Sequence, residues 1–161
     1  MNKLMGVVLA LGLLVVGCDN KRIEKLEEGV STEADVRKQF GEPAQINPEA
    51  DGSRIFEYPR QPEGWTNYAI TIGPDGKMSS LRQLLTETNF AKVTPGLDKG
   101  QVLKMLGKPA KTQFFQLKGE EIWDWRYKPK QDSRIFSVTY DGQGRVLRTA
   151  SMDDPRETMA K

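Results

Sequence analysis

The 161-residue chain contains no histidine, and its only cysteine is Cys18. These two absences exclude structural disulfides, cysteine clusters, His-containing zinc sites and nucleophile systems of the Ser-His-Asp or Cys-His type. Carboxylates and lysines are present, but no motif arranges them for catalysis. We therefore predict a protein that is not an enzyme and that uses neither a metal nor a cofactor.

A strong charge of either sign is also missing. The chain has 24 basic and 22 acidic residues, a net charge of +2, and no stripe of lysine and arginine. Nucleic-acid binding needs such a basic stripe. We expect no nucleic acid among the partners.

One long apolar run is present, from Leu4 to Val16, and it follows the basic residue Lys3. Its thirteen residues would span about 20 Å as a helix, which is shorter than a hydrocarbon core of roughly 30 Å. The run therefore has the length of a signal-peptide core and not that of a stable membrane span.

The run leads into Leu14-Val15-Val16-Gly17-Cys18, which resembles the lipobox of bacterial lipoproteins. The resemblance implies that residues 1–17 are a signal peptide and that Cys18 carries covalent lipid, palmitate included. Several acyl chains hold a protein stably at a membrane, whereas one chain anchors it only marginally. The alternative is an ordinary cleaved secretory signal with a free thiol at Cys18. Asp19 resembles the signal that keeps lipoproteins in the inner membrane of enteric bacteria.

The rest of the chain repeats itself at a spacing of 66 to 68 residues. In each copy, a polar residue able to cap a helix precedes an apolar i, i+4 pair, and a Gly-x-Pro sequence follows. This pattern predicts one short capped helix per copy, with a helical turn ahead of it. The matching positions are Gly29 and Gly96, Val36 and Val102, Phe40 and Leu106, and Gly41-x-Pro43 and Gly107-x-Pro109, with caps at Ser31 or Thr32 and at Asp98, where Gln101 completes a capping box.

The second half of each copy alternates apolar and polar residues, which is typical of half-buried strands. Glycine-rich turns follow, and a last strand begins near Met78 and near Val146. Each copy is thus predicted to be α+β, an ααβββ module with a short helix pair packed on a three-stranded antiparallel sheet. The alternating positions are Phe56, Tyr58, Tyr68, Ile70 and Ile72 in the first copy, and Trp123, Trp125, Phe136, Val138 and Tyr140 in the second.

We expect the first module to cover residues 18–86 and the second residues 87–152. Units of this size bury little core alone, so the two modules should share an interface. Residues 153–161 are polar and are predicted to form a frayed C-terminal tail.

Residues 92–109, KVTPGLDKGQVLKMLGKP, together with the aromatic strand 123–129 and the hairpin 138–147, resemble the SmpA/OmlA signature. That family of small outer-membrane lipoproteins includes BamE. The first copy matches more loosely, and known members usually carry one module. The resemblance implies a lipid anchor and a role in steadying the barrel-assembly complex through partner lipoproteins and phospholipid.

The function implied is that of a non-catalytic scaffold or assembly factor, lipid-anchored in the cell envelope and facing the periplasm. It would act in outer-membrane β-barrel assembly or envelope integrity, with barrel-assembly subunits among its partners. The family favours the outer membrane, whereas Asp19 favours the inner one. The alternative function is a periplasmic inhibitor or ligand-binding protein of the tandem β-lactamase-inhibitor type.

Four residues are candidates for contact with a partner or with anionic phospholipid. Arg126 matches the basic residue on the family's contact surface. Trp65 lies in a loop outside the strand alternation, where large aromatic residues are enriched at interfaces. Lys128 and Lys130 flank a proline and could reach anionic head groups. The alternative for Trp65 is packing on its own module, and for the three basic residues it is simple solvation.

Overall fold

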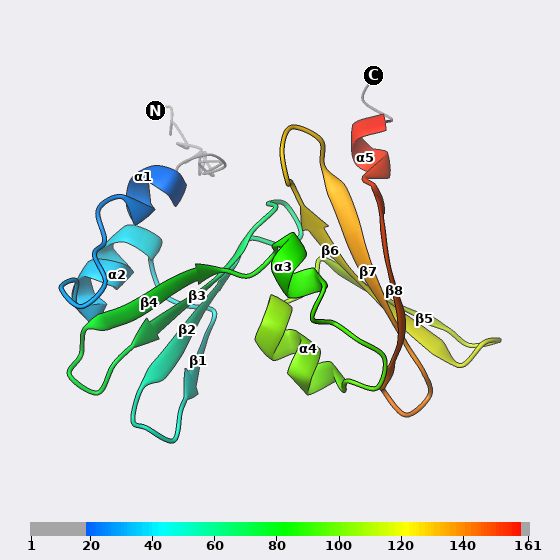
Figure 1. Cartoon of the computed structure of the whole chain (residues 1–161). Coiled ribbons are helices and arrows are strands. Elements are labelled where there is room, and N and C mark those ends of the chain that lie inside the picture. Colours follow the sequence, from blue (N-terminus) through cyan, green and yellow to red (C-terminus); the bar gives the residue numbers. More distant parts are fainter. Residues whose placement is uncertain (1–18, 159–161) are drawn as a thin grey trace, which may run out of the picture.

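The computed structural model describes residues 19–158. It contains two four-stranded antiparallel sheets, and two helices precede each sheet in the chain (Figure 1). The predicted α+β class and the tandem modules are thereby confirmed. The signal segment 1–17, Cys18 and the last three residues of the tail lie outside the described residues.

The first module contains α1 (Asp19–Ile23), α2 (Glu33–Phe40), β1 (Gln45–Pro48), β2 (Arg54–Pro59), β3 (Asn67–Ile72) and β4 (Met78–Gln83). The second contains α3 (Glu87–Phe90), α4 (Lys99–Leu106), β5 (Lys111–Phe115), β6 (Glu120–Tyr127), β7 (Arg134–Tyr140) and β8 (Val146–Asp153), and α5 (Pro155–Thr158) follows. The strands of each sheet are in sequence order.

Capping boxes start both long helices. At α4, the Asp98 carboxylate accepts a hydrogen bond from the backbone N–H of Gln101, and the Gln101 side chain accepts one from the N–H of Asp98, each over 2.9 Å. At α2, Thr32 and Asp35 form the same reciprocal pair. Each box satisfies amides that have no partner within the helix. The predicted helix starts are confirmed.

Both long helices end on a glycine with a positive φ, 81° at Gly41 and 71° at Gly107. Residues with a Cβ rarely adopt this conformation. The carbonyl oxygen of Gly41 accepts a hydrogen bond from the Tyr58 hydroxyl over 3.0 Å, and that of Gly107 accepts one from the Trp125 indole N–H over 2.9 Å. The two modules therefore tie their helix to their sheet at the same place.

Each module has its own apolar core between helix and sheet. The cores include Val36, Phe40, Phe56, Tyr58, Tyr68, Ile70, Ile72 and Met78 in the first module. They include Leu85, Phe90, Val93, Val102, Leu106, Trp125, Tyr127, Phe136, Val138, Tyr140 and Val146 in the second. Apolar area removed from water contributes about 25 cal/mol per Å², so these faces hold each helix on its sheet.

The sheets have four strands and not the three predicted. The additional strands, β1 and β5, each pair with one neighbour, β2 and β6 respectively. Every residue of β5 is exposed, and so are three of the four residues of β1. Alternation of apolar and polar residues reveals a strand only when one face is buried. These two strands bury neither face, and the sequence pattern therefore misses them.

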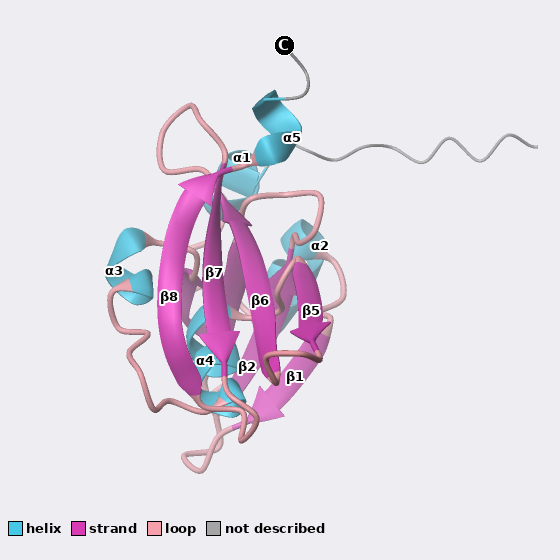
Figure 2. Ribbon diagram, turned by 90° about the vertical axis from the view of Figure 1, so that its right-hand side faces the viewer, coloured by secondary structure: helices cyan, strands magenta, loops and turns pink. Residues whose placement is uncertain are grey.

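The elements form successive layers. Helices α3 and α4 lie between the two sheets (Figure 1), and the outer face of the second sheet has no described helix over it (Figure 2). No helix within residues 19–158 is long and apolar enough to cross a membrane.

The C-terminal segment corrects the prediction of a frayed tail from residue 153. Asp153 is the last residue of β8, and Asp154 is 1% exposed. The Asp154 carboxylate accepts hydrogen bonds from Arg126 and from the Ser133 hydroxyl over 2.6 and 2.9 Å. A buried ion pair thus holds a segment that its polar composition alone would leave in solvent.

Candidate functional site

Trp65 joins the two modules. Its indole N–H donates a hydrogen bond to the Ser133 hydroxyl over 2.8 Å. The guanidinium carbon of Arg126 lies 5.6 Å from the centre of the Trp65 ring, and the ammonium nitrogen of Lys128 lies 4.8 Å from it. Three of the four candidate residues are therefore neighbours, although about 60 residues separate Trp65 from the others in the chain.

Arg126 lies inside the junction and is 6% exposed. Besides its ion pair with Asp154, its guanidinium donates hydrogen bonds to the carbonyl oxygens of Pro62 and Glu63 over 3.1 and 3.2 Å. All of these partners belong to the chain itself. The structure thus corrects the prediction that Arg126 contacts an external ligand, because the loop of the first module covers the strand face on which it lies.

The side chain of Gln61 extends the edge of β6. Its amide nitrogen donates to the Arg126 carbonyl over 2.8 Å, and its amide oxygen accepts from the Arg126 N–H over 3.0 Å. The last β6 residue paired with β5 is Asp124, which leaves the backbone of Arg126 open on that side. Gln61 supplies both missing hydrogen bonds and is itself buried.

Asn67 makes the second junction contact. Its side-chain amide donates to the carbonyl oxygens of Leu106 and Lys108 over 2.8 and 2.9 Å, and the residue is 1% exposed. Carbonyls at the end of a helix have no partner within the helix. Asn67 of the first module therefore caps helix α4 of the second. Sequence reasoning misses both Gln61 and Asn67, since nothing local distinguishes them from surface amides.

The carboxylate of Asp154 is held in its charged form. Burial alone raises its pKa, but hydrogen bonds from the backbone N–H of Arg156, from Arg126 and from Ser133 outweigh that effect. The pKa of Asp154 therefore lies below its ordinary value, and the ion pair with Arg126 is intact at neutral pH.

Two cavities flank the junction. One has a volume of about 520 Å³ and is lined by Asp19 and Asn20 of α1 together with Trp65 and Tyr68. The other, of about 650 Å³, is lined by Phe90, Tyr127, Lys130 and Glu157 among others. Lys130 is exposed and lines the second cavity, which Trp65 does not line.

Asp19 fixes helix α1 to the junction loop. Its two carboxylate oxygens accept hydrogen bonds from the Arg60 guanidinium over 3.1 and 3.2 Å. The first described residue of the chain is thus held beside Trp65. Figure 1 shows α1, α5 and the β6–β7 loop at the same end of the molecule.

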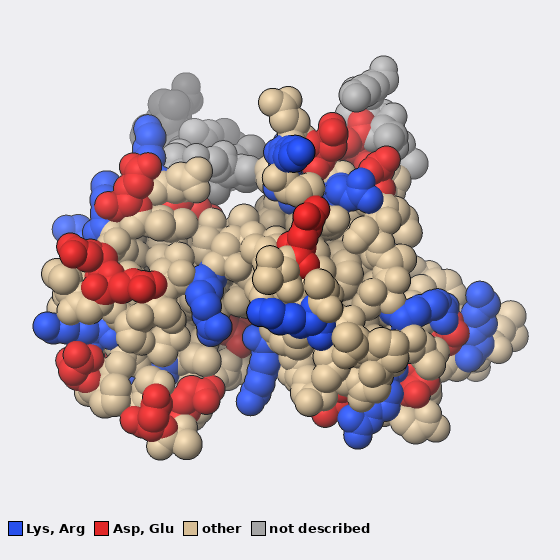
Figure 3. Space-filling model, in the orientation of Figure 1, with Lys and Arg blue, Asp and Glu red and all other residues tan. Residues whose placement is uncertain are grey.

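Two ion pairs lie at the junction, Arg126 with Asp154 and Arg60 with Asp19. No group of three or more Cys, Asp or Glu residues within 19–158 could hold a metal ion. Figure 3 shows positive and negative side chains interspersed over the visible face, without an extended region of one sign.

No family model and no curated protein sequence matches the chain. Among solved structures, a protein described as an osmotically inducible lipoprotein, OsmE, is similar to 48% of this chain over 90% of its own length, with 20% identity and a TM-score of 0.39. YjgB, a DUF4309 family protein from Bacillus subtilis, is similar over 84% of this chain and 92% of its own, with 16% identity and a TM-score of 0.31.

A protein from Streptococcus mutans described as a β-lactamase inhibitor protein is similar over 84% of this chain and 94% of its own, with 10% identity and a TM-score of 0.33. All three TM-scores are below 0.5, and all three identities are below 25%. The resemblance to the SmpA/OmlA family stays a prediction.

Proposed function

We propose that the chain is a lipid-anchored, non-catalytic docking protein of the bacterial cell envelope. In this function it serves as a scaffold or assembly factor for outer-membrane β-barrel proteins, or for envelope integrity. The observation that carries the proposal is that Asp19 and Trp65 line one cavity, because Asp19 directly follows the lipobox-like cysteine.

A lipid on Cys18 would hold the junction end of the molecule against a bilayer. Trp65 and the exposed side chains of Lys128 and Lys130 lie at that end. Lysines near a membrane surface are attracted to anionic head groups, and these two are the residues that we assign to phospholipid contact. The Lys128 ammonium nitrogen also lies 4.0 Å from a carboxylate oxygen of Glu157. This negative charge weakens the attraction of Lys128 to anionic head groups.

The anchor is tested by growing cells that express the chain with labelled palmitate. The wild-type protein should take up label and sediment with membranes, and the Cys18→Ala variant should do neither. Absence of label from the wild type would contradict the proposal. An Asp19→Ser variant tests which membrane holds the protein. If Asp19 is an inner-membrane retention signal, the variant should move from the inner to the outer membrane.

The docking role is tested by purification of the full chain in mild detergent. Barrel-assembly subunits should co-purify with the wild type, and a strain that lacks the protein should insert barrel proteins poorly. Normal barrel insertion in that strain, with no subunit recovered, would exclude the assembly role. The Cys18→Ala variant serves as the control for recovery that depends on the anchor.

A second function is favoured by the outer face of the second sheet, over which no described helix lies (Figure 2). The loop of the first module covers this face only where it bonds Arg126. Ile135 lies on that face opposite Met152, which is 51% exposed. An inhibitor could use such a face to bind a soluble hydrolase. In that case the hydrolase should co-purify with the chain in place of barrel-assembly subunits, and Ile135→Arg should abolish its recovery.

A further inference from the structure

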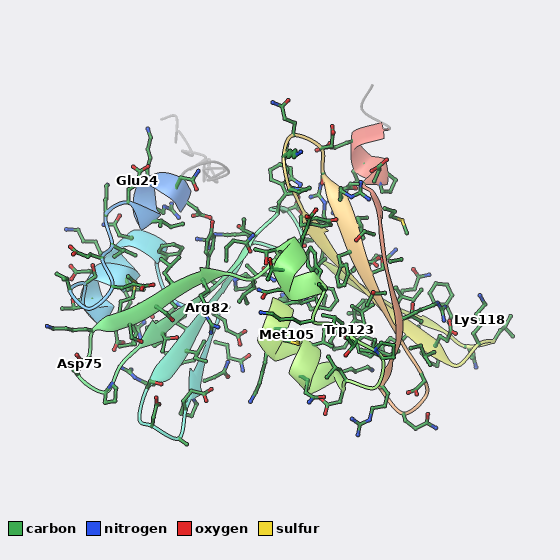
Figure 4. All side chains as sticks on the ribbon, viewed as in Figure 1. Glu24, Asp75, Arg82, Met105, Lys118 and Trp123 are labelled. Atoms are coloured by element: carbon green, nitrogen blue, oxygen red, sulfur yellow. The ribbon has the colours of Figure 1, made fainter. Side chains whose placement is uncertain are left out.

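The hairpin between β5 and β6 presents apolar side chains to solvent. Leu117 is fully exposed, at 104%, and Phe114 is 63% exposed, the two highest values among the large apolar residues in 19–158. Phe115 is 36% exposed beside them. Figure 4 shows Lys118, the next residue after Leu117, at a hairpin tip that projects away from the rest of the second module. Clustered apolar exposure of this kind marks interaction sites.

The outer edge of β5 is free to take another strand. β5 pairs with β6 on one side and with no described strand on the other. Its counterpart β1 is shorter and ends on Pro48, which has no N–H and so blunts the edge. β5 contains no proline, so each amide that faces its outer edge keeps an N–H donor. A free edge with exposed aromatic residues is a template for strand addition.

The charge left unpaired along β5 and the hairpin is positive on balance: Lys111 and Lys118 carry two positive charges, and Asp124, the cross-strand partner of Lys111, carries one negative charge bonded within 19–158 only by the Ser137 hydroxyl. Glu120 accepts two hydrogen bonds from Arg148 over 2.8 and 3.0 Å, and Glu121 forms an ion pair with Lys99. Lys111 at the start of β5 and Lys118 at the tip form no ion pair with any residue in 19–158. A partner that carries acidic residues beside its apolar ones complements this surface.

The position of the hairpin argues against a bilayer as its occupant, an argument that rests on the proposed anchor. β6 begins at the hairpin and ends beside the junction where Asp19 lies. Its eight residues span about 26 Å at roughly 3.3 Å each. A membrane at the Asp19 end is therefore separated from the tip by the length of the strand.

The same geometry argues against an antiparallel pairing of two copies of this chain, the more stable way for two such edges to pair. Two β5 edges paired antiparallel about Gln113 would run in opposite directions. The anchored end of one copy would then point away from the membrane that holds the other. A different protein has no such constraint.

We propose that the free edge of β5 and the β5–β6 hairpin bind an extended segment of a partner protein, which joins the second sheet as a fifth strand. Apolar side chains of the segment contact Phe114, Phe115 and Leu117, and its acidic residues lie beside Lys111 and Lys118. Backbone hydrogen bonds along the edge supply affinity, and the side chains supply specificity.

The test uses the full-length chain in mild detergent, immobilised and exposed to a phage-displayed library of random twelve-residue peptides. Because Phe114 and Phe115 point to opposite faces of β5, selected peptides should carry apolar residues on both faces of the strand that they form, and they should be acidic. A labelled selected peptide should bind at least ten times more weakly to the Phe114→Ser/Leu117→Ser double variant and to Lys111→Glu/Lys118→Glu. Ile46→Ser is the matched control, because Ile46 is 40% exposed on the counterpart strand β1, and it should bind as the wild type does.

Backbone pairing has its own readout. A bound peptide should slow hydrogen exchange at the β5 amides that face away from β6, which alternate along the strand with those bonded to it, but not at the amides of β1. Unchanged exchange in β5, or selected peptides that bind the hairpin variants as tightly as the wild type, would overturn the proposal.

The same variants test the two other occupants of the edge, a second copy of the chain and a bilayer. A dimer in detergent that Phe114→Ser/Leu117→Ser dissociates would assign the edge to a second copy. Hairpin-dependent binding to phosphatidylglycerol-containing vesicles would assign it to the bilayer. Either result overturns the proposal. Peptide binding does not depend on lipidation, so loss of palmitate label with retained peptide binding would reject only the proposed anchor.

Discussion

The Nε atom of Arg126 donates a hydrogen bond to Oδ2 of Asp154 over 2.6 Å, and the two side chains are 8% and 0% exposed. The same guanidinium bonds carbonyl oxygens of the first module. A buried ion pair adds little net stability compared with well-packed apolar residues, yet removal of one partner leaves a buried charge without compensation. The pair therefore makes the junction of the modules sensitive to either residue alone.

Asp154→Ala should lower the free energy of unfolding by about 3–5 kcal/mol, since it leaves the Arg126 charge buried and unpaired. Urea titration at neutral pH measures the change. Asp153→Ala is the control, because Asp153 pairs with Arg134 while 75% exposed, and exposed pairs contribute about 0–1 kcal/mol. Equal losses in the two variants would show that the buried pair has no special role.

The junction should also weaken in acid. The pKa of Asp154 lies below its ordinary value in the folded protein, so its contribution is complete above the ordinary value of about 3.9 and is lost as the pH falls through the folded pKa. Urea titrations between pH 6 and about pH 2 should therefore show a steeper loss for the wild type than for Asp154→Asn. Parallel curves for the two proteins would contradict the assignment.

Trp65→Phe and Trp65→Ala separate two contributions to the junction. The phenylalanine variant keeps a ring beside Arg126 and Lys128 but loses the hydrogen bond to Ser133, which should cost about 1 kcal/mol of unfolding free energy. The alanine variant also loses the ring and its cation contacts, and should cost about 2–3 kcal/mol. Urea titration checks both, and an alanine variant as stable as the wild type would show that the loop does not hold the modules together.

Local features of the sequence were sufficient to predict the paired helices. The caps at Thr32 and Asp98 and the glycines at Gly41 and Gly107 act over a few residues, so their effect can be read from spacing alone. Strand β5 was not predicted, and the reason is physical. Exposed on both faces, it lacks the apolar alternation that identified β6 and β7.

The candidate site was predictable only in part. Trp65 stood out as an aromatic residue in a loop, and the structure places it at an interface. Its partner Ser133 and the buried Asp154 come from distant segments, and Asp154 lies in a stretch whose polarity indicates a loose tail. An ion pair between residues 28 positions apart leaves no local pattern, so Arg126 was predicted to face outward when it is in fact enclosed.

Replacement of Asn67 by alanine or by aspartate should lower the free energy of unfolding. Alanine leaves the Leu106 and Lys108 carbonyls without their donor, at a cost of about 1–3 kcal/mol. At neutral pH, aspartate should cost at least as much, because it places a carboxylate against the two carbonyl oxygens. Urea titrations of both variants at pH 7 and pH 4 provide the check. The aspartate variant should recover relative to alanine at pH 4, where a protonated carboxyl can donate, and no recovery would contradict the role of Asn67 as a donor.

Loss of the hydroxyl should affect the free energy of unfolding differently at two buried tyrosines. The Tyr140 hydroxyl is buried and has no hydrogen-bond partner among residues 19–158, whereas the Tyr58 hydroxyl donates to the Gly41 carbonyl. Burial raises the pKa of both phenols, that of Tyr58 to about 12, so each stays neutral and acts only through hydrogen bonding at ordinary pH. A buried hydroxyl without a partner costs free energy, and one that is bonded contributes about 1 kcal/mol.

Tyr140→Phe should therefore leave the free energy of unfolding unchanged or raise it by up to about 1 kcal/mol, and Tyr58→Phe should lower it by about 1 kcal/mol. Both substitutions keep the ring that fills the core, so cavity formation does not obscure the comparison. Urea titration of the two variants beside the wild type gives the difference directly. A destabilised Tyr140→Phe would mean that this hydroxyl has a hydrogen-bond partner in solution. The second module would then be fixed by a polar contact that has no counterpart at Ile72, the matching position in the first.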